Sequence, residues 1–141
     1  MNETPIQVTQ TDFDRLGRLL DGWWAPDART QPLLDRLQEE LDRARVVANG
    51  EVDPDCITLG SEVVLRDLDT GWPSIHRLVW PNDAAGSHKA LSILSPIGVA
   101  ALGYREGDEF VCETPGGLRR LRVEKVLFQP ECASQAEEPV F

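Results

Sequence analysis

The spacing of apolar residues changes once along this chain, and that change limits the folds it can adopt. Before residue 50, apolar residues recur every three or four positions, whereas after residue 60 they alternate with polar ones. The first spacing is typical of helices with one apolar face, and the second is typical of strands in a half-buried sheet. The sequence therefore predicts an α+β fold in which helices precede an antiparallel sheet.

Two helices are predicted in the first part of the chain. Their apolar faces are formed by Phe13, Leu16, Leu20 and Trp23, and by Leu34, Leu37, Leu41 and Ala44. We expect a capping box at Thr11, a first-turn proline at Pro32 and a helix C-cap at Asn49-Gly50. Arms of roughly 13 to 17 residues would be only about 20–25 Å long. The prediction is a short antiparallel helical hairpin packed as a coiled coil.

The turn between these helices, GWWAPDART at residues 22–30, supplies three candidate functional residues: Trp24, Asp27 and Arg29. Trp24 either packs on the protein itself or contacts a partner, since tryptophan is common at interface hot spots. Asp27 is a single carboxylate, which makes a poor magnesium site unless a partner supplies the other oxygen ligands. We therefore expect no metal site and no cofactor.

The second part of the chain predicts about five antiparallel strands and one short helix. The strands are expected near residues 62–66, 75–80, 91–94, 109–113 and 118–128. Ser95 is a suitable N-cap and Pro96 a suitable first helical residue, so the short helix should begin there and end at Gly103.

The expected organisation has three parts. A helical hairpin occupies residues 1–52, a sheet domain occupies residues 53–130, and an acidic, flexible tail occupies residues 131–141. The polar joint EVDPD, at residues 51–55, lies between the first two and is expected to bend.

Composition excludes several classes of function. A formal charge of −10 disfavours direct nucleic-acid binding, which depends on clustered Lys and Arg. Cys56, Cys112 and Cys132 show no paired spacing, so free thiols in a reducing cytoplasm are expected. The sequence shows neither a signal peptide nor an apolar run of about 18 residues, so no membrane role is predicted.

Enzymatic chemistry has no recognisable sequence signature here. His76 lies in an expected strand and His88 in a loop, and neither is near a typical nucleophile motif. GVAALG lacks the glycine spacing and the lysine of a phosphate-binding loop. No catalytic residue is predicted.

Three stretches resemble the C-terminal domain of the Gre transcript-cleavage factors: ITLGSEVVLRDLDTG, ALSILSPIGVAALGYREGDEF and TPGGLRRLRVEKVLFQP. The shared order is Gly-Ser, Ser-Pro-Ile-Gly, Ala-x-Leu-Gly, Gly-Asp and Pro-Gly-Gly, over residues 56–130. With the hairpin that contains LLDRLQEELDRARVV, the chain apart from its tail resembles the Rnk family, the Gre-related regulators of nucleoside diphosphate kinase.

This resemblance implies an FKBP-like sheet domain that binds RNA polymerase, and a hairpin directed toward the secondary channel. The positions that match the polymerase-docking loop of the Gre family are Ser95, Pro96, Ile97 and Gly98. Gre factors have a much longer coiled coil whose tip presents two acids to a catalytic magnesium ion, whereas this tip offers Asp27 alone. The resemblance therefore implies a cytoplasmic, non-enzymatic regulator that competes with Gre factors without stimulating cleavage.

Two alternatives remain open from the sequence. One is direct regulation of nucleoside diphosphate kinase as a protein partner. The other is prolyl isomerisation, which an FKBP-like domain would allow.

Overall fold

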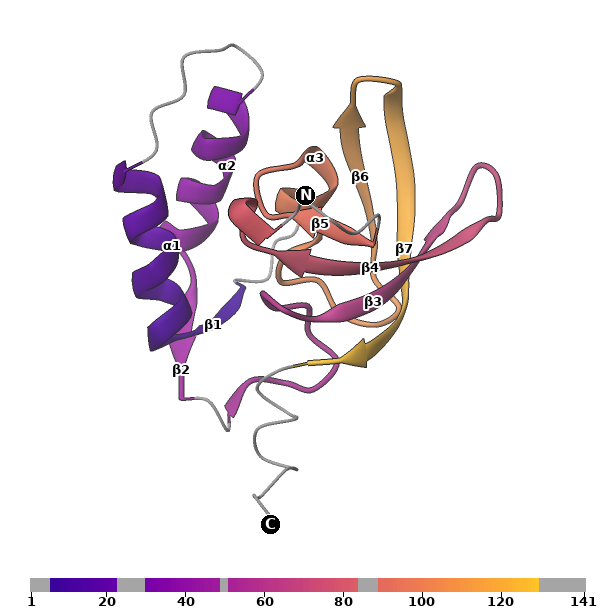
Figure 1. The fold of residues 1–141 in the computed structure, drawn as a ribbon. Coiled ribbons are helices and arrows are strands. Elements are labelled where there is room, and N and C mark those ends of the chain that lie inside the picture. Colours follow the sequence, from indigo (N-terminus) through magenta and orange to yellow (C-terminus); the bar gives the residue numbers. More distant parts are fainter. Residues whose placement is uncertain (1–5, 23–29, 49–50, 84–88, 130–141) are drawn as a thin grey trace.

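The computed structural model describes residues 6–22, 30–48, 51–83 and 89–129. Two helices lie beside a curled sheet that carries a third, short helix (Figure 1). The predicted α+β class is therefore confirmed. No helix within the described ranges is long and apolar enough to cross a membrane.

The hairpin helices are α1 (Gln10–Gly22) and α2 (Thr30–Asp42), each of 13 residues. The predicted cap at Thr11 is wrong by two positions, because the backbone N–H of Asp12 donates to Oγ1 of Thr9 at 3.1 Å. Oγ1 of Thr9 thereby satisfies a backbone donor that has no partner within the helix.

The predicted end of α2 at Asn49-Gly50 is also wrong. The helix ends at Asp42, and strand β2 (Arg45–Val47) follows almost at once. β2 pairs in parallel with strand β1 (Gln7–Thr9), which leads into α1. Val46 and Val47 are β-branched and favour the extended conformation, and the pairing with β1 gives their backbone groups partners. The two ends of the hairpin are thus tied together at its base.

The main sheet has five strands in the order β5-β4-β3-β7-β6. They are β3 (Glu62–Asp67), β4 (Pro73–Val79), β5 (Ala90–Ser92), β6 (Glu109–Thr114) and β7 (Gly117–Phe128). The expected alternation holds in β3, where Val63 and Leu65 are buried and their neighbours are partly exposed.

The expectation of a fully antiparallel sheet is wrong for one pair of strands. β5 pairs in parallel with β4, with Leu91 opposite Leu78. Residues 80–89 separate the two strands, and parallel pairing requires a connection longer than a tight hairpin turn. A 3-10 turn, η2 (Pro81–Asp83), follows β4 directly.

One hydrophobic core is shared by the hairpin and the sheet. Leu16 of α1 and Leu37 of α2 are fully buried in the same cluster as Leu65 of β3 and Ile93. Short isolated helices are marginal in water, so this shared burial stabilises the hairpin. The helical hairpin thus shares its core with the main sheet rather than standing alone.

Candidate functional site

The residues matched to the polymerase-docking loop lie at the start of helix α3 (Pro96–Ala101). Oγ of Ser95 accepts a hydrogen bond from the backbone N–H of Gly98 at 3.0 Å and donates one to the carbonyl oxygen of Ser92 at 2.7 Å. Pro96 occupies the first turn, where its missing N–H costs nothing. The predicted helix start is confirmed, and the loop is fixed on both sides of Ser95.

Gly98 is buried and serves a packing role. A Cβ at this position would collide with the carbonyl oxygen of Ser92, so only glycine allows the loop to fold this closely onto the helix. Ile97 packs partly against the core, while Ser95 and Pro96 are half-buried. Of the four predicted docking residues, Ser95, Pro96 and Ile97 therefore offer surface to a partner, and Gly98 shapes their backbone.

Pro96 lines an open groove of about 970 Å³. The apolar residues along this groove are Pro32 and Leu33 of α2, Leu94, Pro96 at the start of α3, and Pro115 and Leu118 of the β6–β7 hairpin. Leu118 is 66% exposed, which is high for a leucine and leaves an apolar surface at the groove. Sequence reasoning missed the groove because its walls come from three separate stretches of the chain.

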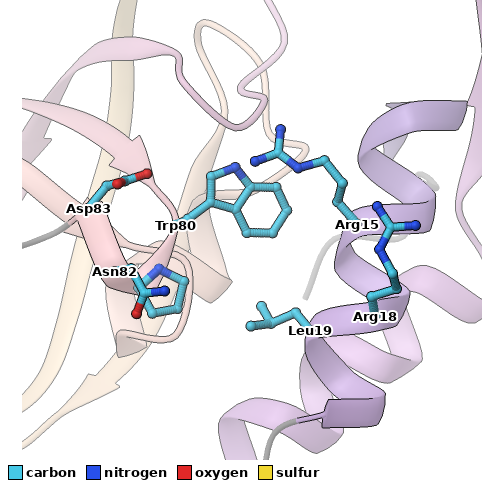
Figure 2. Close-up of a pocket in the computed structure, with 7 residues that line it drawn as sticks. Arg15, Arg18, Leu19, Trp80, Asn82 and Asp83 are labelled. Atoms are coloured by element: carbon cyan, nitrogen blue, oxygen red, sulfur yellow. The ribbon is translucent and has the colours of Figure 1, made fainter.

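A second cleft, of about 440 Å³, lies between α1 and the end of β4 (Figure 2). It is lined by Arg15, Arg18, Leu19, Trp80, Pro81, Asn82 and Asp83. The guanidinium carbon of Arg15 lies 4.3 Å from the centroid of the Trp80 ring. No sequence signal pointed to this cleft, since its two walls are about sixty residues apart in a chain that folds back on itself.

The predicted tip residues, Trp24, Asp27 and Arg29, fall within residues 23–29 and lie outside the described part of the chain. Their roles stay predictions. Cys132, His88 and the acidic tail also lie outside it.

Two buried cysteines and His76 have pKa values shifted by burial. Burial raises the pKa of the Cys56 thiol to about 11 and also raises the pKa of Cys112, so both stay protonated near neutral pH. Oγ of Ser74 and Nε2 of His76 lie 2.8 Å apart, and burial, followed by the charge of Arg119, lowers the pKa of His76. Within the described ranges, no carboxylate is hydrogen-bonded to His76 to orient it as in a catalytic triad.

Metal binding is equally unsupported by the described side chains. Across residues 6–22, 30–48, 51–83 and 89–129, no group of three or more His, Cys, Asp or Glu residues is placed to hold a metal ion.

Two family models match this chain. The model described as transcription elongation factor GreA/GreB, C-terminal, matches residues 51–128, and the model described as Rnk N-terminus matches residues 4–47.

Individual relatives show the same two-part similarity. The regulator of nucleoside diphosphate kinase from Escherichia coli K12 is 35% identical over 134 residues, which cover 94% of this chain and 96% of that protein. Transcription elongation factor GreA from Desulfotalea psychrophila is 38% identical over 90 residues, covering 64% of this chain and 56% of that factor.

A solved structure extends the similarity to the fold. The prokaryotic transcription elongation factor GreA/GreB from Nitrosomonas europaea superposes with a TM-score of 0.75 at 34% identity, over 89% of this chain and 100% of that one. Together, the match over nearly the whole length of the nucleoside diphosphate kinase regulator and the two family models show that this chain belongs to the Rnk family of GreA/GreB-related proteins.

Proposed function

We propose that this chain is a non-enzymatic, cytoplasmic regulator of transcription that binds RNA polymerase. It binds through residues 95–98, competes with Gre factors at the secondary channel and does not stimulate transcript cleavage. The observation that carries the proposal is the short hairpin joined to a GreA/GreB-type C-terminal region, with only 13 residues in each helix.

The docking loop supports this proposal through its rigidity. The two hydrogen bonds of Ser95 and the buried Gly98 fix the backbone that presents Pro96 and Ile97. A preformed loop loses little conformational entropy on binding. The groove beside Pro96 adds apolar surface, to which Leu94 and Leu118 contribute.

The length of the hairpin argues against cleavage stimulation. A helix of 13 residues is about 20 Å long, and each missing turn removes about 5.4 Å of reach. Magnesium coordination requires ligand oxygens at about 2.0–2.1 Å, so a finger short by even one turn leaves Asp27 out of contact with a metal in the polymerase.

A competition experiment tests the proposal. Core RNA polymerase is titrated with the wild-type chain in the presence of a labelled Gre factor, and then with Ser95→Ala, Pro96→Ala and the control Pro73→Ala, which lies at the start of β4. We expect the wild type and the control to displace the Gre factor, and the two loop variants to lose displacement while keeping their circular dichroism spectra. Undiminished displacement by both loop variants would rule out this docking loop.

A second candidate function is direct regulation of nucleoside diphosphate kinase. The similarity to the Escherichia coli protein named for that regulation favours it. The test is the rate of purified kinase with and without this chain. A concentration-dependent change in rate supports direct contact, and an unchanged rate leaves only an effect through transcription.

The finer description of the fold belongs to the same proposal. It comprises an FKBP-like sheet domain, coiled-coil packing of α1 on α2, and the division at residues 1–52, 53–130 and 131–141. If the FKBP-like likeness extended to activity, the chain would accelerate isomerisation of a prolyl peptide. We expect no acceleration at high protein concentration, because the proposed role is in binding.

A further inference from the structure

The charged residues that line the cleft between α1 and the end of β4 are Arg15, Arg18 and Asp83. Among the described residues, the arginines that form ion pairs are Arg43, Arg66, Arg77, Arg105, Arg119, Arg120 and Arg122, whereas Arg36 and Arg45 are in none of these ion pairs. Arg15 and Arg18 are in none of the ion pairs formed within the described ranges, although both line the cleft. Two guanidinium groups that form no ion pair with a described residue thus line the same cleft.

Arg15 is held in place by an aromatic contact instead of a carboxylate. Its guanidinium carbon lies over the Trp80 ring, 4.3 Å from the ring centroid. A cation–π contact of this kind uses no N–H hydrogen bond to a carboxylate, so guanidinium donors remain for an acceptor in the cleft. Figure 2 shows Arg15 and Leu19 extending from α1 toward Trp80 on the opposite wall.

Arg18 provides a second cation on the same helix. Residues three apart on a helix have Cβ atoms about 5–6 Å from each other, so Arg15 and Arg18 can reach one ligand. Asn82 contributes an amide on the other wall, and Asp83 contributes the opposing carboxylate. With two arginines and one acid, the lining of the cleft has a net positive charge.

We propose that this cleft binds a small phosphate-bearing anion. Guanidinium groups match the oxygen geometry of phosphate and form paired, charge-assisted hydrogen bonds with it. The volume of about 440 Å³ is sufficient for a diphosphate or a mononucleotide. Phosphate oxygens of a nucleic-acid backbone have the same chemistry, but the overall charge of −10 repels a long polyanion far more than a small one.

The site differs from the docking loop in position and in chemistry. The groove beside Pro96 is mostly apolar and uses α2 and the β6–β7 hairpin, whereas the cleft uses α1 and η2. A bound anion would bridge the helical hairpin and the sheet domain, because Arg15 and Arg18 belong to the first and Asn82 belongs to the second. Ligand binding should therefore strengthen the contact between the two parts.

Isothermal titration calorimetry at low ionic strength tests this proposal with the full chain, using pyrophosphate and ADP as separate probes. We expect single-site binding of pyrophosphate and an affinity about tenfold lower in Arg18→Gln, since hydrogen bonds to charged groups are the strong ones. The matched control Arg45→Gln removes the same charge from the exposed strand β2 and should change affinity by less than about twofold, because Arg45 does not line the cleft. Asp83→Asn should bind pyrophosphate more tightly.

Comparison of the ligands shows which class of phosphate compound the cleft binds. ADP binding as tight as pyrophosphate, with the same loss in Arg18→Gln, identifies a nucleoside phosphate as the ligand class. A short single-stranded RNA that binds more tightly than either probe and depends on Arg18 overturns the small-anion assignment. Absence of heat with millimolar pyrophosphate, or equal losses in Arg18→Gln and Arg45→Gln, overturns the site itself. Arg15→Lys keeps the charge but removes the planar fork, so weakened binding there shows that guanidinium geometry matters.

Discussion

Gln7 and Asp53, which are 46 residues apart in the sequence, exchange two hydrogen bonds of 3.0 Å. Nε2 of Gln7 donates to Oδ2 of Asp53, and the backbone N–H of Asp53 donates to Oε1 of Gln7. The same carboxylate pairs with Arg105 at 2.6 Å, and Gln129 donates to the carbonyl oxygen of Asp53 at 2.7 Å. The polar joint expected to bend is therefore attached to β1, to the residue that follows β7 and to the turn before β6. Bending at this joint stays a prediction.

Substituting this carboxylate should loosen the joint. We expect Asp53→Ala to lower the free energy of unfolding by about 1–3 kcal/mol, since it leaves the amide of Gln7 without its acceptor. The neighbouring Asp55→Ala is the matched control and should cost less than about 0.5 kcal/mol. Urea denaturation measures both, and equal midpoints for the two variants would contradict the role given to Asp53.

Two glycines, Gly98 and Gly17, should respond to alanine substitution with opposite changes in stability. Gly98→Ala should destabilise the chain by about 1–3 kcal/mol, because the added Cβ meets the carbonyl oxygen of Ser92. Gly17→Ala in α1 has open space around it and should stabilise the helix by about 0.5–1 kcal/mol. Thermal unfolding monitored by circular dichroism gives the two signs directly. A stabilising effect at position 98 would show that the loop can relax.

The N-cap of α1 can be located by mutation. Thr9→Ala should cost about 0.5–2 kcal/mol, since it removes the side-chain acceptor of the Asp12 N–H. Thr11→Ala changes the residue that the sequence pattern favoured and should have little effect. Denaturant titration of the two variants compares them, and the reverse order of stabilities would restore Thr11 as the cap.

The buried thiol of Cys56 predicts a dependence of stability on alkaline pH. Burial raises its pKa from 9.0 to about 11, so the folded chain keeps a proton that the unfolded chain loses. The stabilising contribution is complete below pH 9 and is lost as the pH rises through about 11. The loss should reach roughly 2–3 kcal/mol.

Urea denaturation between pH 8 and about 11.5 measures this slope. Cys56→Ala lowers stability at every pH but should flatten the decline, whereas Cys112→Ala should leave most of the Cys56 contribution in place. A wild-type decline that Cys56→Ala does not reduce would assign the titration to other groups, such as Tyr104, whose pKa burial also raises.

The exposed leucine of the groove offers a test of the proposed polymerase contact. Leu118→Ser should weaken polymerase binding about fivefold or more if it is part of an interface hot spot. Its fold should be unchanged, because the side chain is 66% exposed. Leu127→Ser, at a leucine that is 44% exposed at the far end of β7, is the control. Equal polymerase binding by the two variants would show that the groove is not part of the polymerase contact.

The sequence was sufficient where structure depends on local spacing. The alternation of Val63 and Leu65 predicted β3, and Ser95 followed by Pro96 predicted the start of α3, because capping and periodicity act within a few residues. The strands β1 and β2 were missed because each has three residues, too few to show alternation, and because their partner is distant in the sequence. The parallel pairing of β5 was missed for the same reason of distance.

Sites formed between distant segments escaped prediction in the same way. Pro96 was identified from its motif, but Pro32 and Leu118 joined it in the groove only through tertiary packing. Arg15 and Trp80 carry no shared signal in the sequence, and each alone reads as an ordinary surface or core residue. Family resemblance supplied a prediction that spacing could not, since it assigned residues 95–98 to a docking loop without indicating which residues surround them.

The pairing of β1 with β2 fixes the base of the helical hairpin independently of its length. Gln7 and Arg45 are paired at the base of the hairpin. Residues added or removed near its tip therefore need not alter how the base of the hairpin packs against the main sheet. Whole helical turns could be inserted between Gly22 and Thr30 without changing the β1–β2 pairing. Members of one family could thus evolve fingers of different reach on a common platform, and the same design lets an experimenter lengthen this one turn by turn.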